Sequence, residues 1–216
     1  MKNIFYPYTI LNENIFPVFG DEIVGDPHYI NLVETDPLSA EDAKEWRFGE
    51  IKKFNKNWGY SGYLENRSRQ LTSKIMAAEK RFFHLGIDLH VPTGIKIYAP
   101  LDGEVVVSEY EDGVGNYGGL VVLKHIVKSD VFYSVYGHLK KDLLPKLNSN
   151  IAKGENFEEI GDMTENGNWA PHLHLQVLTE KGFNEGWVHK GYCSLDNLID
   201  ISYYCPNPIF LLKYKI

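Results

Sequence analysis

The sequence predicts a mainly β protein, an antiparallel β-sandwich or open barrel that carries an irregular, partly helical N-terminal extension. From His84 onward, short runs rich in Val, Ile, Tyr and Phe follow one another closely. Gly, Asp, Asn and Pro separate these runs, as in Asp102-Gly103 and in GNYGG at 115–119. Short strands with turn residues between them are typical of antiparallel sheets.

Residues 1–83 differ in texture, and we expect them to form an extension packed on the core. In DPLSAEDAKEWRFGEIKKF, Ser39 is a candidate N-cap and acidic residues precede basic ones, which suits a helix and its dipole. A second helix is predicted within LENRSRQLTSKIMAAEKRFF, where Leu71, Ile75 and Ala78 have helical spacing.

Residues 84–180 are expected to form the β core, and 181–216 a tail packed on it. The predicted strands are rich in β-branched and aromatic residues, and the run 128–130 indicates a hairpin turn. They cover 96–101, 103–110, 119–127, 131–139 and 172–178.

Composition excludes several classes of function. The net charge is -7 and no dense Lys/Arg run occurs, which argues against nucleic-acid binding. No apolar run approaches the ~18 residues of a transmembrane span. The first residues lack the apolar core and cleavage site of a signal peptide, which favours a cytoplasmic over an exported protein. Cys193 and Cys205 are then expected to be free thiols.

The segment HLGID, residues 84–88, pairs a histidine with an aspartate, and both are good zinc ligands. Leu85, Ile87 and Leu89 alternate with other residues, which favours a strand. Residues four apart on a straight strand lie ~13 Å apart, too far to share an ion. If both bind one metal, the chain must bend between them, and Gly86 is the residue that would allow it.

Two further clusters contain histidines. In PHLHLQV, His172 and His174 alternate with leucines, so a strand would point both imidazoles to one face. In YSVYGHL, His138 ends an aromatic strand. Taken singly, each cluster also fits ordinary surface or structural histidines.

Together the clusters are more specific. HxxxD, a Tyr-x-His-Leu strand end and Pro-His-Leu-His, in this order and in β context, resemble the lysostaphin/LytM-type zinc endopeptidases. The stretches VPTGIKIYAPLDGEVV, GNYGGLVVLKH and KLNSNIAKGENFEEIGD also look like segments of that family. The resemblance covers roughly residues 82–178.

This resemblance implies a Zn²⁺ ion held by His84, Asp88 and His174, with water in the fourth position. It implies catalytic roles for His138 and His172 and a supporting role for Tyr136. The implied reaction is hydrolysis of an amide bond in a peptide or peptidoglycan-like substrate. Trp169 departs from the family's glycine-rich approach to Pro-His-Leu-His and is expected to narrow the groove.

Two alternatives remain. The chain could be an inactive member that binds peptides without cutting them, if the extension supplies an Asn, Asp or His that fills the fourth metal position. VPTGIKIYAPLDGEVV also looks like half of a biotin- or lipoyl-carrier domain. The nearest candidate lysine, Lys124, lies within an apolar strand and not at a hairpin tip.

Overall fold

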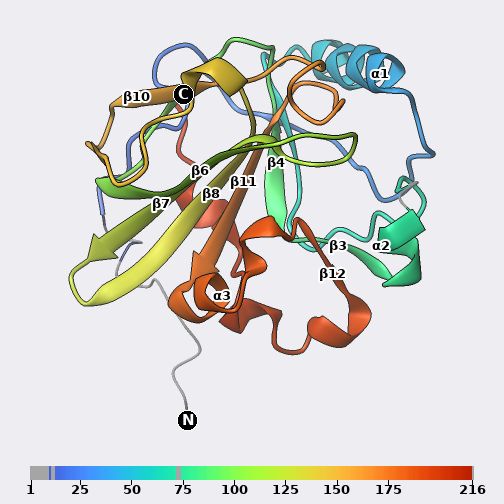
Figure 1. Ribbon diagram of the computed structural model, residues 1–216. Coiled ribbons are helices and arrows are strands. Elements are labelled where there is room, and N and C mark those ends of the chain that lie inside the picture. The colour runs from blue at the N-terminus through green and yellow to red at the C-terminus, as the bar shows by residue number, and fades with distance from the viewer. Residues whose placement is uncertain (1–9, 11–12, 72–73, 216) are drawn as a thin grey trace.

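The computed structural model describes residues 10, 13–71 and 74–215 and confirms a mainly β fold with few helices (Figure 1). The helices are short apart from α1, and five 3-10 turns lie at 141–143, 187–189, 195–197, 201–203 and 208–211. The strands are β1 His28–Tyr29, β2 Gly59–Ser61, β3 Arg81–His84, β4 Gly86–His90, β5 Lys96–Tyr98, β6 Gly103–Glu111, β7 Gly118–Val127, β8 Asp130–Leu139, β9 Asn150–Ile151, β10 Asn156–Glu159, β11 Leu173–Thr179 and β12 Tyr192–Ser194. The α-helices are α1 Ala40–Lys53, α2 Lys74–Ala78 and α3 Glu180–Asn184.

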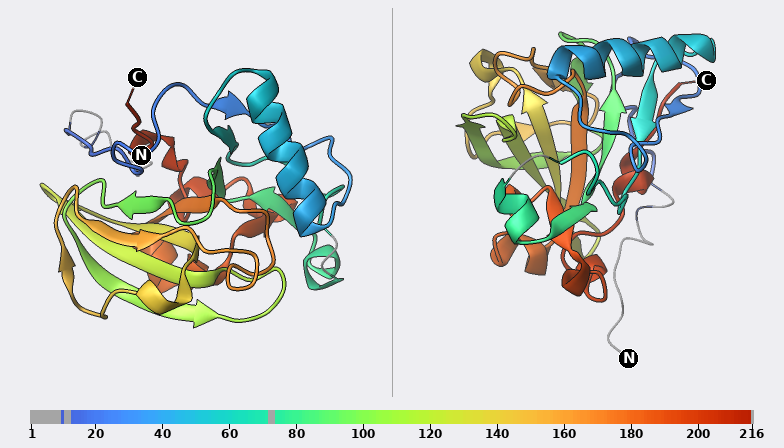
Figure 2. Two further views of the ribbon diagram at one scale, coloured as in Figure 1. Left: turned by 90° about the horizontal axis from the view of Figure 1, so that it is seen from above. Right: turned by 90° about the vertical axis from the view of Figure 1, so that its right-hand side faces the viewer.

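One sheet of eight strands organises the fold, in the order β1-β2-β4-β11-β8-β7-β6-β9. All neighbours in it are antiparallel except β1 and β2. Two small sheets, β5 with β10 and β3 with β12, flank it. Helices α1 and α3 lie near opposite ends of the central strands (Figures 1 and 2).

Both faces of the large sheet are buried. Along β7, Val121 and Leu123 belong to one apolar cluster, while Leu120 and Val122 belong to another. The first cluster includes residues of β5, β10 and the N-terminal segment, and the second includes residues of 187–205. Strand side chains alternate between faces, so an uninterrupted apolar run such as GLVVL is what a doubly covered strand requires.

The helix predicted around 40–53 is confirmed. Ser39 caps α1, since its hydroxyl accepts a hydrogen bond from the Asp42 amide. The strands predicted from residue 96 onward are also present, and β7 and β8 form a hairpin at the predicted turn. Cys193 and Cys205 are buried free thiols. No helix among the described residues is long and apolar enough to cross a membrane.

The helix predicted within residues 64–83 is largely wrong. Among the residues of this range that the structure describes, only the five of α2 are α-helical, and β3 follows at Arg81. Upstream, the Leu64 amide donates to the His84 carbonyl, and the Arg67 amide donates to the Phe82 carbonyl. This pairing with β3 satisfies the backbone groups that a helix would otherwise use, so tertiary contacts override the local propensity.

Candidate metal centre

The bend expected between His84 and Asp88 exists, but Gly86 has a different reason to be there. His84 ends β3, which pairs with β12, and Gly86 begins β4, which pairs with β11 and β2. The chain therefore changes partners at Leu85. A Cβ on Gly86 would lie 2.6 Å from Cε1 of His174 and 2.7 Å from the Leu175 carbonyl oxygen. The glycine lets the His174 ring approach the backbone closely.

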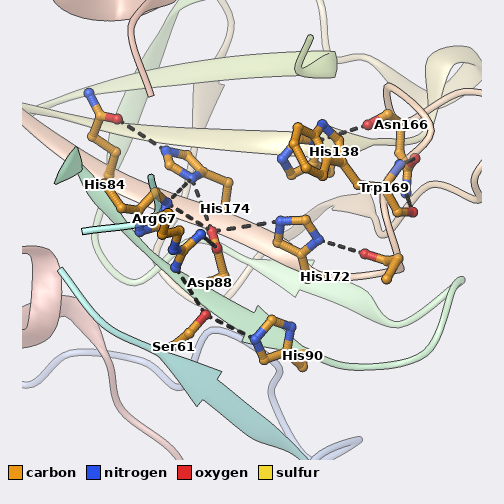
Figure 3. Close-up of polar contacts among 12 residues, drawn as sticks. Ser61, Arg67, His84, Asp88, His90, His138, Asn166, Trp169, His172 and His174 are labelled. Carbon is orange, nitrogen blue, oxygen red and sulfur yellow. Dashed lines mark hydrogen bonds and ion pairs between the residues drawn. The ribbon is translucent and has the colours of Figure 1, made fainter. Parts of the chain in front are cut away.

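The sheet register places three metal-ligand types together. Asp88 on β4 lies directly opposite His174 on β11, and the bend returns His84 to the same point. Oδ1 of Asp88 lies 3.2 Å from Nε2 of His84 and 3.1 Å from Nδ1 of His174. The two nitrogens are 3.1 Å apart, and Figure 3 shows all three side chains converging. Among the described residues, this is the one buried cluster of metal-ligating groups.

Each of the two histidines, His84 and His174, uses its other ring nitrogen in a hydrogen bond outside the cluster, and this fixes which nitrogen faces Asp88. Nδ1 of His84 lies 3.1 Å from the Gly62 carbonyl oxygen, and Nε2 of His174 lies 3.0 Å from Oε1 of Gln176. In the neutral rings, those nitrogens carry the proton and donate it. The converging nitrogens then hold lone pairs, as does the Asp88 oxygen, and no hydrogen bond can join the two rings. Three lone pairs this close together repel one another, and a cation bound between them would remove that repulsion.

The donor set fits zinc. Two imidazole nitrogens and one carboxylate oxygen are typical of a catalytic zinc site with a fourth position left for water. Tetrahedral bonds of 2.0–2.1 Å would set ligand atoms about 3.3–3.4 Å apart, close to the separations seen here.

The site is buried, and burial sets its protonation. Burial, and after it the Arg67 guanidinium, lower the pKa of His84 from 6.5 to about 4. Burial alone would raise the pKa of Asp88, but His84 and Arg67 hold it well below its usual value. At neutral pH, His84 is therefore neutral and Asp88 charged, the forms that bind metal.

His138 reaches the site through a β-bulge. Gly119 pairs with Leu139 and Leu120 with Gly137, so His138 is the extra residue of β8, and its φ is +68°. Its ring centroid lies 4.4 Å from that of His172 and 6.2 Å from that of His174. As the alternating pattern predicted, His172 and His174 both line one pocket.

His138 and His172 share one hydrogen-bonding arrangement. Nδ1 of His138 lies 2.9 Å from the Asn166 carbonyl oxygen, and Nδ1 of His172 lies 2.7 Å from the Ala170 carbonyl oxygen. Each Nδ1 donates, so each Nε2 keeps its lone pair for another partner. Burial lowers the pKa of His138 to about 3 and that of His172 well below its usual value. Both rings are neutral, so both can accept a proton.

Tyr136 lies elsewhere. It pairs with Leu175 on the face opposite His174 and packs in the apolar core, 5.0 Å from the ring of Phe157. The pocket is lined instead by Tyr117, whose ring centroid is 5.2 Å from that of His174. No sequence signal distinguished Tyr117.

The N-terminal extension supplies groups that the sequence did not single out. Nη1 of Arg67 lies 2.6 Å from Oδ2 of Asp88, and Arg47, Gln70, Met76 and Arg81 also line the pocket. Among the described residues, the extension brings no Asn, Asp or His to that lining. Trp169 lines the pocket as predicted, and its indole donates to the Asn116 carbonyl.

Comparison with known proteins gives the family. Residues 82–185 match Peptidase family M23. The chain is 30% identical over 118 residues to the peptidoglycan DD-endopeptidase ShyC of Vibrio cholerae, and the match covers 55% of this chain but 24% of that protein. These matches support the lysostaphin/LytM-type peptidase family, M23, for residues 82–185.

Two solved peptidase structures are among those similar to this chain. The catalytic domain of lysostaphin from Staphylococcus simulans is 20% identical, with a TM-score of 0.46 over 67% of this chain and 92% of that one. A zinc-containing peptidase from Vibrio cholerae is 26% identical, with a TM-score of 0.42 over 55% of this chain and 32% of that one.

Proposed function

We propose that this protein is a zinc-dependent peptidase that hydrolyses an amide bond of a peptide, and that His84, Asp88 and His174 hold the metal. The observation that carries the proposal is the convergence of three lone pairs from these residues, 3.1–3.2 Å apart, with their other polar atoms already engaged. Zinc, when bound there, would polarise the scissile carbonyl and make a water molecule more acidic.

His138 and His172 supply the proton transfers in this proposal. Their Nδ1 atoms donate to backbone carbonyls, so Nε2 is the lone-pair atom of each ring, and Nε2 of His172 lies 3.6 Å from Oδ1 of Asp88, beside the proposed metal position. A neutral Nε2 accepts a proton from the attacking water, and the imidazolium so formed donates it to the leaving amine. The charged ring also stabilises the oxyanion of the tetrahedral transition state. The two ring centroids lie 4.4 Å apart, so both rings border the same part of the pocket.

Peptides of the peptidoglycan type are the first substrates to test, because the curated relative is named a peptidoglycan DD-endopeptidase. The decisive assay incubates the zinc-loaded protein with a peptide library that includes muropeptides and identifies products by mass spectrometry. We expect cleavage with about one zinc per chain. Peptide binding without cleavage would instead favour a peptide-binding module.

Variants separate metal binding from catalysis. His84→Ala and His174→Ala should lose zinc and activity together. His138→Ala should keep its zinc and lose roughly 10²- to 10⁴-fold in kcat, the usual contribution of a general acid or base. His28→Ala is the matched control, because His28 stacks on Phe54 outside the pocket and should change neither property. Unchanged zinc content in His174→Ala would show that the metal site is wrongly placed.

A further inference from the structure

Arg47 is an unusual residue for its place in the fold. It lies on the buried face of α1, in the series Ala43, Arg47 and Ile51, and is 5% exposed. An arginine is seldom buried unless an acidic group pairs with it. Yet Nε and Nη1 of Arg47 have no hydrogen-bond partner, and the side chain forms no ion pair with any described residue.

The other two pocket arginines are neutralised. Arg67 pairs with Asp88 and Glu65, and Arg81 pairs with Glu79. Arg47 is therefore the pocket arginine without a direct ion pair among the described residues, and the carboxylates of Asp88 and Glu65 act on it only at longer range. Burial lowers the pKa of Arg47 to about 10, so the side chain stays charged at neutral pH. A buried charge without a partner is costly, and a ligand can supply the missing anion.

Arg47 also lies at a junction. It lines the pocket that holds His84, Asp88 and His174, and it lines a second pocket that shares Arg81 and Trp169 with the first. The second pocket has a mixed lining, whose polar side chains are Ser39, Arg47, Gln70, Arg81, Asn116 and Asn168. Its apolar lining comprises Pro37, Leu38, Ala40, Ala43, Leu71, Met76, Val114, Trp169 and Ala170. An anion held by Arg47 would therefore sit between the metal-ligand cluster and a surface suited to small aliphatic groups.

We propose that Arg47 binds a free carboxylate of the peptide substrate, on a residue with a small aliphatic side chain close to the scissile amide. This inference rests on the proposed peptidase function and names the substrate class: peptides that carry a carboxylate beside the bond that is cut. A guanidinium matches a carboxylate in shape and donates two hydrogen bonds to it. Arg47 lies outside residues 82–185, so the specificity comes from the extension and not from the family domain.

The test measures binding without turnover. The full chain is freed of zinc with a chelator, so that a carboxylate cannot bind through the metal. The probes are N-acetyl-alanyl-alanine and its C-terminal amide, which differ only in the charged group, and calorimetry gives the two dissociation constants. We expect the acid to bind wild type roughly ten- to hundredfold more tightly than the amide, the range for a hydrogen bond to a charged group.

Variants assign the preference to Arg47. Arg47→Gln should bind acid and amide equally, while Arg47→Lys should keep part of the preference because it keeps the charge. Arg69→Gln is the control, since Arg69 pairs with Glu34 and Asp36 on the surface and does not line either pocket. A preference that survives in Arg47→Gln, or is absent from wild type, overturns the proposal. Failure of the peptidase proposal is separate and would appear as absence of cleavage while the acid preference persists.

The stability of the ligand-free protein tests the role of Arg47 independently of peptide binding. If Arg47 is kept for a ligand, Arg47→Met should unfold at the same or a higher urea concentration than wild type in the absence of ligand, because an unpaired buried charge is replaced by an apolar chain of similar length. A clearly lower midpoint would mean that Arg47 holds the fold together, and the proposal would be overturned.

Discussion

Arg67 and Asp88 form a buried ion pair in which Nη1 lies 2.6 Å from Oδ2, on the side of the carboxylate away from the two histidines (Figure 3). Oδ1 of the same carboxylate faces His84 and His174, and Nε2 of His172 lies 3.6 Å from it. The pair therefore fixes which Asp88 oxygen points into the proposed metal position. Arg67 also forms an ion pair with Glu65, and the Tyr29 hydroxyl donates a hydrogen bond to Glu65. Through Asp88, this network links the N-terminal extension to residues 82–185.

Arg67→Met should destabilise the metal-free protein by about 3–5 kcal/mol. The change leaves Asp88 and Glu65 buried without a counter-ion, which is the costly way to break a buried pair. Urea unfolding in the presence of a chelator measures the loss. Arg69→Met, two residues along, removes exposed ion pairs and should cost no more than about 1 kcal/mol. Equal losses in the two variants would contradict a role for Arg67 in holding Asp88.

Gln176→Leu should weaken zinc binding about 10- to 100-fold, because Nε2–H of His174 loses the acceptor that fixes its tautomer and orientation. Competition with a chromophoric chelator measures the affinity. Gln176→Glu keeps an acceptor oxygen at that place and should bind zinc at least as well as wild type. The idea fails if leucine and glutamate variants bind zinc alike.

The clusters around His84, Asp88, His138, His172 and His174 could be found in the sequence because ligand residues lie on short, regular segments. Strand alternation was enough to put His172 and His174 on one face. The need for a bend before Asp88 followed from strand dimensions alone. These features depend on residues close together along the chain.

Features that depend on contacts between residues far apart in the chain could not be predicted from local sequence patterns. Arg67 meets Asp88 only because residues 64–67 pair with β3, where local propensity favours a helix. His138 and Tyr136, two residues apart, should share a face on a regular strand, but the bulge at His138 turns its ring to the opposite side. Arg47 looks like any charged helix residue until the pocket beside it is known.

Gly86→Ala should destabilise the protein by about 1–3 kcal/mol and weaken zinc binding as well. The added methyl group would lie 2.6 Å from the His174 ring and 2.7 Å from the Leu175 carbonyl oxygen, so the ring or strand must shift. Gly49→Ala is the matched control: nothing lies within 4 Å of its added methyl group, and α1 should gain about 0.5–1 kcal/mol. Unfolding curves and zinc titrations of both variants check this. Normal zinc affinity in Gly86→Ala would contradict the steric role given to this glycine.

Glu158 on β10 should make the protein less stable as the pH rises from about 5 to 8. The side chain is 1% exposed, its Oε1 has no hydrogen-bond partner among the described residues, and burial raises its pKa from 4.5 to about 8. Between these values, the folded state holds a proton that the unfolded state has released. The free energy of unfolding therefore falls with rising pH in this window and levels off above it.

Glu158→Gln removes this titration while keeping the shape. The variant should gain stability relative to wild type between pH 5 and pH 8, by about 1 kcal/mol or more, since each pKa unit corresponds to about 1.4 kcal/mol. Urea unfolding of both proteins at the two pH values measures the difference, and subtracting wild type from variant cancels the other titrating groups. A difference that stays constant across the window would mean that Glu158 is ionised in the folded protein, with a partner for its charge.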